Sequence, residues 1–208
     1  MNSNSIIICI AGASGSGKTT FAKKLISALP KKETLLITQD AYYKDLSSLS
    51  LEERANQNFD HPDSLDFELL KKHIIELIKG NTTLQPIYDF NTHSRLTSSK
   101  KIEPEKIIII EGTLVLSQEI LLEFYDLNIY IDLDQKACLS RRIERDIAER
   151  GRTKASVLEQ YNQTVKPMFK EFILPSKGKA DLIIPGENIN ASIQTVIEEI
   201  KKIENNLQ

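Results

Sequence analysis

The sequence predicts an α/β fold: a predominantly parallel sheet of about five strands with helices on both faces. Short apolar runs rich in β-branched residues alternate along the chain with longer segments of helical periodicity, the pattern of a parallel sheet wound with helices. Four of the five runs are continuously apolar, as expected of strands that are covered on both sides.

The expected elements follow in chain order. The strands are Ile6–Ala11, Leu35–Thr38, Ile107–Glu111, Ile129–Leu133 and Leu182–Pro185. The helices are Lys18–Leu29, Leu65–Lys79, Ala137–Glu149, Ala155–Phe172 and Ile189–Asn205. Pro30 ends the first helix, Gly80 caps the second, and Pro167 is expected to kink or break the fourth.

A length of 208 residues predicts a single domain, residues 1–208. Residues 40–105 hold one convincing helix and a polar run from Thr92 to Lys101. We expect this segment to leave the sheet as an excursion on the substrate side, and not to fold separately. A domain boundary near Pro104 is the alternative.

Composition narrows the class of protein. The chain is 40% hydrophobic and its net charge is −2, which excludes wholesale disorder and makes nucleic acid an unexpected partner. The longest apolar run, residues 6–11, is far shorter than the ~20 residues of a membrane span, and residues 1–5 lack the features of a secretion signal. Cys9 and Cys138 show no pairing pattern, so we expect reduced, buried thiols and a cytoplasmic protein.

Residues 12–19 match the phosphate-binding pattern G-x-x-x-x-G-K-[ST] in full, between an expected strand and an expected helix. Backbone N–H groups of such a loop surround phosphate oxygens, Lys18 can reach the β- and γ-phosphates, and the Thr19 hydroxyl can bind Mg²⁺. A glycine-rich turn in an ordinary α/β protein is the alternative. The expected nucleotide-binding residues are Gly12, Ala13, Ser14, Gly15, Ser16, Gly17, Lys18, Thr19 and Thr20.

The phosphate loop predicts a fold like that of the P-loop nucleoside triphosphate hydrolases, but the same loop serves motors, GTP switches and kinases. The N/T-K-x-D stretch of guanine-selective GTPases is missing, because Thr153–Ser156 lacks the aspartate. The chain is also short for a motor. A small kinase is therefore the leading interpretation.

Two acids follow expected strands: Asp40 after residues 35–38, and Glu111 after residues 107–110. Ligands of parallel sheets collect at the carboxyl ends of the strands, and either acid could hold Mg²⁺. Asp40 begins the excursion, where an acceptor would bind, so we assign it the role of general base and place Glu111 on the metal side. A turn cap at Asp40 and a structural acid at Glu111 are the alternatives.

The excursion is rich in aromatic residues, with polar groups between them. An apolar surface with a few directed polar groups suits a flat heterocycle that carries a hydroxylated sugar. Packing into the core is the alternative for each aromatic ring, and a structural role is the alternative for each histidine. The residues concerned are Tyr42, Tyr43, Phe59, Asp60, His61, Tyr88, Asp89, Phe90 and His93.

Residues 141–152 contain five arginines. Such a run is usually an exposed helix face with i,i+3 and i,i+4 ion pairs, and Glu144, Asp146 and Glu149 fit that pattern. In a phosphoryl-transfer protein it could instead form a lid, residues 141–160, with a hinge at Gly151 and guanidinium groups on the transferred phosphate. Composition favours neither interpretation.

Together, these segments resemble the uridine kinase (uridine–cytidine kinase) family of P-loop kinases, in the family's order and over about residues 6–200. The segments are GASGSGKTT at 12–20, QDAYY at 39–43, NFDHPDSLDFELL at 58–70, PIYDFNTHSR at 86–95, IIEG at 109–112, SRRIERDIAERGR at 140–152, QYNQTVKPMFKEFILPSK at 160–177 and ADLIIP at 180–185.

The resemblance implies transfer of the γ-phosphate of ATP or GTP to the 5′-hydroxyl of uridine or cytidine, with Mg²⁺. It implies that Asp40 is the general base and that Thr19 and Glu111 help to hold the metal. It also implies a homotetramer inhibited by UTP or CTP. Carried over by position, the substrate and lid residues are Tyr43, Phe59, Tyr88, Phe90, His93 and Arg152 around the pyrimidine, Asp60, Arg142 and Gln160 at the ribose, and Arg145 and Arg150 at the phosphates.

Two other functions stay open. A related P-loop kinase could act on another alcohol, such as phosphoribulose or pantothenate, although a phosphorylated substrate would favour more basic residues in the excursion. A regulatory module could bind the triphosphate without transferring it, although such a module has no need of Asp40.

Overall fold

The computed structural model describes residues 5–30 and 33–207; residues 1–4, on which the expectation about a secretion signal rests in part, lie outside the described residues. Its main sheet is parallel throughout and runs in the order β2-β5-β1-β6-β7. All five expected strands are confirmed, and no end differs from the expected one by more than two residues. They are β1 (Ile6–Gly12), β2 (Thr34–Thr38), β5 (Ile107–Gly112), β6 (Leu127–Asp132) and β7 (Leu182–Pro185).

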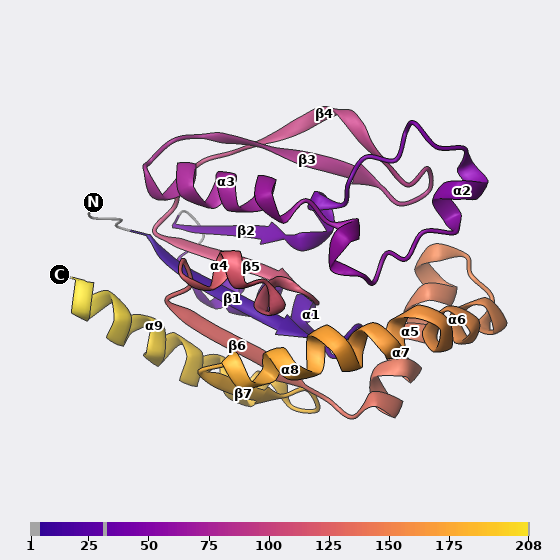
Figure 1. The fold of residues 1–208 in the computed structure, drawn as a ribbon. Helices are drawn as coiled ribbons and strands as arrows, with labels where there is room; N and C mark the ends of the chain where they lie inside the picture. The colour runs from indigo at the N-terminus through magenta and orange to yellow at the C-terminus, as the bar shows by residue number, and fades with distance from the viewer. Residues whose placement is uncertain (1–4, 31–32, 208) are drawn as a thin grey trace.

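Both faces of the sheet are covered, as the continuously apolar strands predicted (Figure 1). Side chains of β1 point alternately to the two faces. Ile8 packs with α1 (Lys18–Ala28) and α9 (Ile193–Leu207), whereas Cys9 packs in the cluster that includes α3 (Phe67–Ile78). Cys9 and Cys138 are free and buried, as expected.

The helix that carries the arginine run, α5 (Gln135–Arg150), has clear caps at both ends. The Asp134 carboxylate accepts a hydrogen bond from the Lys136 backbone at 2.7 Å. Gly151 ends the helix with a left-handed backbone (φ 62°), a conformation that glycine adopts without a steric cost. A short helix, α4 (Glu119–Leu122), precedes β6.

The expected break at Pro167 is absent, because the chain stays helical from Lys154 to Ser176. Wider π-helical turns flank the proline on both sides, and such turns accommodate a residue that cannot donate the regular hydrogen bond. The segments are α6 (Lys154–Gln160), a π turn (Tyr161–Val165), α7 (Lys166–Met168), a second π turn (Phe169–Ile173) and α8 (Leu174–Ser176).

The excursion is more regular than the sequence indicated. Its polar run forms the second strand of an antiparallel hairpin, β3 (Thr83–Asp89) and β4 (Ser94–Ile102), above β2 and α3 in Figure 1. A second helix, α2 (Leu51–Ala55), begins with a capping box. Most of β4 is exposed, so the alternation of apolar and polar residues that marks a half-buried strand is missing.

Gly112 ends β5 against the buried side chain of Gln39. A Cβ atom at Gly112 would lie 2.4 Å from the Gln39 Cβ, and the Gln39 amide is held in place because it accepts a hydrogen bond from the Leu114 backbone at 2.7 Å. We therefore expect Gly112→Ala to lower the free energy of unfolding by about 1–3 kcal/mol, measured by urea denaturation.

Gly178→Ala is the matched control, because no atom lies within 4 Å of the added Cβ position. This control should unfold at the midpoint of the unmodified protein. An unchanged midpoint for Gly112→Ala would mean that Gln39 moves aside without cost.

Candidate functional site

The phosphate loop has the backbone that its motif predicted. It connects β1 to the first turn of α1, which begins at Lys18. Gly15 has a φ of 85°, and a Cβ atom there would lie 2.2 Å from the Cys138 carbonyl oxygen, so this position requires glycine. The loop therefore presents backbone N–H groups beside the N-terminus of a helix, which suits an anion.

Lys18, Thr19, Asp40 and Glu111 come together at the carboxyl ends of β2 and β5. The Thr19 hydroxyl donates a hydrogen bond to the buried Glu111 carboxylate at 3.1 Å. Burial raises the pKa of Glu111, and the Lys18 charge opposes that shift. Burial lowers the pKa of Lys18, whereas the charges of Glu111 and Asp40 raise it.

Asp40 lies in a short 3₁₀ turn (Gln39–Tyr42) directly after β2, and its side chain is exposed. Thr38 takes the cap position of that turn, so capping does not explain Asp40. A cavity of about 360 Å³ opens beside it, between β2 and the hairpin. Its lining residues are Leu36, Thr38, Asp40, Ala41, Gln85, Pro86, Ile87, Tyr88, Phe90 and Lys100.

The aromatic cluster is centred on Tyr43. Its ring centroid lies 5.1 Å from that of Tyr88, 5.7 Å from Phe59 and 6.2 Å from Phe90. His93 stacks on Phe59 with a centroid separation of 4.6 Å and an interplanar angle of 19°. Burial raises the pKa of Tyr43 well above its usual value, and the Asp40 charge adds to this shift.

Tyr42 does not belong to this cluster. It is fully buried in the core, and its hydroxyl is 3.0 Å from Nδ1 of His73 on α3. The structural alternative is therefore the correct one for this ring. His93, in contrast, is held with a left-handed backbone (φ 49°), which is uncommon for a residue with a side chain.

Two arginines that the sequence analysis did not single out hold the excursion together. Arg95 of β4 donates to the Tyr43 and Tyr42 carbonyls at 2.8 and 3.2 Å. Arg54 of α2 donates to the Thr92 carbonyl at 2.9 Å, next to His93. Arg54 lies in a polar stretch that no local pattern marks, whereas Arg95 ends the segment PIYDFNTHSR and could have been singled out from it.

The arginine run is not simply an exposed helix face. Glu144 and Glu149 are exposed as that interpretation requires, but Asp146 and Arg142 are buried. Arg142 donates to the Ser14 hydroxyl of the phosphate loop at 2.9 Å and to the Gln160 amide oxygen at 3.0 Å.

The other proposed lid residues lie around Arg142. Arg152 also donates to the Gln160 amide oxygen, and to the Ser156 carbonyl at 2.9 Å. Arg145 donates to Asp146, and its charge lowers the pKa of Lys18 further. Arg150 lies over the Phe90 ring, with its guanidinium carbon 5.5 Å from the centroid.

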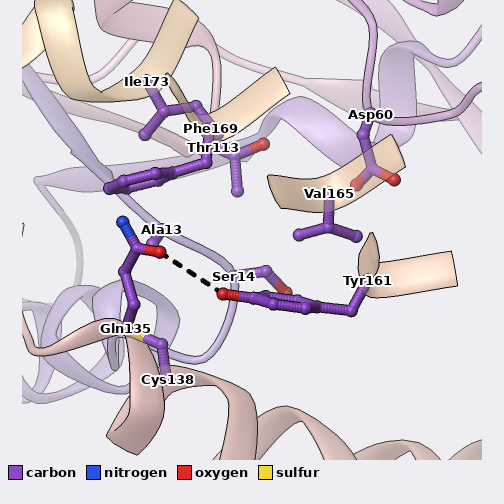
Figure 2. Close-up of a pocket in the computed structure, with 10 residues that line it drawn as sticks. All are labelled: Ala13, Ser14, Asp60, Thr113, Gln135, Cys138, Tyr161, Val165, Phe169 and Ile173. Atoms are coloured by element: carbon purple, nitrogen blue, oxygen red, sulfur yellow. Dashed lines mark hydrogen bonds between the residues drawn. The ribbon is translucent and has the colours of Figure 1, made fainter. Parts of the chain in front are cut away.

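Asp60 lies on the wall of a cavity of about 20 Å³ between the phosphate loop, α5 and the helical residues 154–176 (Figure 2). Its carboxylate accepts a hydrogen bond from the Thr164 hydroxyl at 2.8 Å. Across this cavity the Tyr161 hydroxyl donates to Gln135 at 3.4 Å, and Ser14 lies beside Tyr161. The excursion and the phosphate loop therefore face the same space.

The oxygen atoms of Thr19 and Glu111 suit Mg²⁺. This ion prefers hard oxygen ligands and is commonly held by one or two carboxylates together with substrate phosphates and water. Within residues 5–30 and 33–207, no group of three or more His, Cys, Asp or Glu side chains forms a complete metal cage, so phosphate oxygens would have to complete the shell.

Among the described residues, no helix is both long and apolar enough to cross a membrane.

Comparisons with known proteins agree on one family. The model of the phosphoribulokinase/uridine kinase family matches residues 7–191. The chain is 45% identical to a uridine kinase of Halalkalibacterium halodurans, over 98% of this chain and 97% of that protein. It is 44% identical to a uridine kinase of Clostridium tetani, over 98% of each chain.

Solved structures with low sequence identity share the fold. A possible uridine kinase from Bacillus stearothermophilus aligns with a TM-score of 0.56 at 20% identity, over 86% of this chain and 88% of that one. A phosphoribulokinase from Rhodobacter spheroides aligns with a TM-score of 0.64 at 16% identity, over 88% of this chain and 70% of that one. These alignments confirm the α/β P-loop fold that the sequence predicted.

Proposed function

Because the chain belongs to the phosphoribulokinase/uridine kinase family, we propose that it is a uridine/cytidine kinase. It transfers the γ-phosphate of ATP or GTP to the 5′-hydroxyl of a pyrimidine nucleoside and so serves pyrimidine salvage. The observation that carries this proposal is that Asp40 lies close enough to both Lys18 of the phosphate loop and Tyr43 of the aromatic cluster for its charge to raise the pKa of each. We also propose that residues 1–208 act as one kinase domain, in a cytoplasmic homo-oligomer, a tetramer by family resemblance.

The donor side consists of the phosphate loop, Lys18, Thr19 and Glu111. Backbone N–H groups of residues 12–19 bind the phosphate oxygens, and the charges of Glu111 and Asp40 lie close enough to the Lys18 ammonium to raise its pKa. Thr19 and Glu111, 3.1 Å apart, would hold Mg²⁺, with Asp40 as a further candidate ligand. Mg²⁺ held there would supply positive charge that neutralises the β- and γ-phosphates.

Asp40 acts as the general base. A sugar hydroxyl is a weak nucleophile, and a carboxylate that accepts its proton makes it a better one. Asp40 is exposed at the mouth of a cavity, so an acceptor can reach it without rearrangement of the core.

The acceptor side is the aromatic cluster together with the lid residues. Tyr43, Phe59, Tyr88, Phe90 and His93 surround the pyrimidine, and Arg152 closes over it. Asp60, Arg142 and Gln160 contact the ribose hydroxyls. Arg145 and Arg150 serve the phosphates; of the two, Arg150 lies over the Phe90 ring in this structure.

Two observations weigh against the other functions. Six of the ten residues that line the cavity beside Asp40 are apolar or aromatic and a single one, Lys100, is basic, which suits a nucleoside better than a sugar phosphate. A sensor that binds the triphosphate without transferring it has no need of an exposed acid beside the acceptor cavity, and Asp40 is such an acid.

The direct test is a coupled assay of the purified protein with ATP or GTP and a panel of acceptors. The panel contains uridine, cytidine, adenosine, ribulose 5-phosphate and pantothenate. We expect turnover with uridine and cytidine. Turnover confined to ribulose 5-phosphate or pantothenate, or none with any acceptor, would overturn the proposal.

His93→Ala is expected to raise the KM for the nucleoside about 10-fold and to leave the KM for ATP within twofold. The reason is that stacking of a base against a ring is worth about 1–3 kcal/mol, and His93 lies in the acceptor cluster. Leu96→Ala, at an exposed side chain of the same hairpin, is the control and should change neither constant. Equal effects of His93→Ala on both constants would remove His93 from base recognition.

A further inference from the structure

Asp146 is a fully buried carboxylate in the middle of the arginine run. It is 0% exposed, and four guanidinium groups lie within 3.7 Å of it: those of Arg142, Arg145, Arg150 and Arg152. A carboxylate loses most of its hydration when it is buried, so a position of this kind needs a specific reason.

The two oxygens of Asp146 face different arginines. Oδ1 accepts hydrogen bonds from Nε and Nη2 of Arg145 at 3.0 and 2.8 Å, and Nη1 of Arg150 is 3.6 Å away. Oδ2 lies 3.6 Å from Nε of Arg142 and 3.7 Å from Nη1 of Arg152. Within the described chain, neither Oδ2 nor Nε of Arg142 has a hydrogen-bond partner.

These arginines reach different parts of the site. Arg142 bonds to Ser14 in the phosphate loop, and Arg142 and Arg152 share the Gln160 amide oxygen. The charge of Arg145 affects Lys18, and Arg150 lies over Phe90 in the acceptor cluster. A single carboxylate thus lies beside side chains that extend to the phosphate loop and to the aromatic cluster around Tyr43.

We propose that Asp146 is a positioning residue that orients the lid arginines toward both the phosphate donor and the acceptor. This inference rests on the proposed function. Four guanidinium groups packed closely repel one another, and the buried anion offsets that repulsion and directs each group. A carboxylate retained for stability alone would be expected to have both oxygens hydrogen-bonded, whereas Oδ2 of Asp146 lies near two guanidinium groups but accepts no hydrogen bond from any described residue.

The first test is Asp146→Asn, which keeps the side-chain shape and removes the charge. We expect kcat to fall about 100-fold and the KM for the nucleoside to rise about 10-fold. The reason is that the arginines near the phosphate loop and those near the aromatic cluster would no longer be held in their orientations. Val157→Ala, a truncation of a buried side chain on α6, controls for loosened packing near the lid and should leave kcat within threefold. An Asp146→Asn enzyme with normal kcat and KM would overturn the proposal.

The second test is a double-mutant cycle with Arg145→Ala. If Asp146 acts through Arg145, the loss of kcat caused by Asp146→Asn shrinks from about 100-fold to below 10-fold in the Arg145→Ala background. A purely structural role predicts that the two losses multiply, and that result would overturn the proposal.

If Asp146→Asn does not fold, Asp146→Glu enters the same cycle. Asp146→Glu keeps the charge but moves it by one methylene group, so kcat should fall about 10-fold. In the Arg145→Ala background, the additional loss of kcat caused by Asp146→Glu should again be smaller than in the unmodified protein. Failure of the proposed function would be seen in the unmodified protein, as absent nucleoside turnover. Failure of this inference would be seen only in the cycle.

Discussion

Asp40→Asn is expected to lower kcat by about 10²–10⁴-fold, the usual contribution of a general base, and to leave ATP affinity within a few-fold. Asparagine has nearly the same shape as aspartate but cannot accept the proton of a 5′-hydroxyl. Asp40 is exposed and the Gln39–Tyr42 turn is anchored by Gln39 and Tyr42, so the substitution changes the chemistry without disturbing the packing.

Steady-state kinetics and the shift of the melting temperature with ATP separate the two effects for Asp40→Asn. Asp63→Asn, at an acid whose side chain is 89% exposed, is the control and should behave as the unmodified protein. If Asp40→Asn keeps more than half of kcat, another group removes the proton.

Arg145→Ala is expected to lower kcat by about 10²–10³-fold, because a guanidinium group placed at the transferred phosphate stabilises charge in the transition state. Arg145 is the lid arginine whose charge affects Lys18, which places it on the donor side. Arg150 lies over Phe90, so we expect Arg150→Ala to raise the KM for the nucleoside more than Arg145→Ala does.

The comparison of Arg145→Ala with Arg150→Ala therefore tests whether Arg145 acts mainly on kcat and Arg150 mainly on the KM for the nucleoside. Lys154→Ala, at an exposed position on α6, provides a control for the loss of a positive charge. An unchanged kcat for Arg145→Ala would return this arginine to the role of an ion-pair partner of Asp146.

The sequence predicted the main sheet well because its strands carry their own signal. Residues 107–110 are four isoleucines in a row, and a run of that kind is stable only where both faces are covered. The phosphate loop was equally predictable, since its glycines, Lys18 and Thr19 lie within eight consecutive residues and need no distant partner.

The hairpin and the π turns were not predictable in the same way. Strand β4 buries little apolar surface, so its pattern resembles that of a loop, although backbone pairing with β3 holds it. Pro167 normally ends a helix, but wider turns on both sides carried the helix past it.

By itself, the sequence determined the parallel sheet, the phosphate loop and the acids at the strand ends, because each depends on neighbouring residues. Only the tertiary structure decided which aromatic rings cluster around Tyr43, which ring belongs to the core and which arginines face inward. Arg142 contacts Ser14 across 128 positions of sequence, and Asp146, which fits an exposed helix face in the sequence, is completely buried. Charges arranged by such distant contacts leave no local pattern, since their partners are chosen by packing.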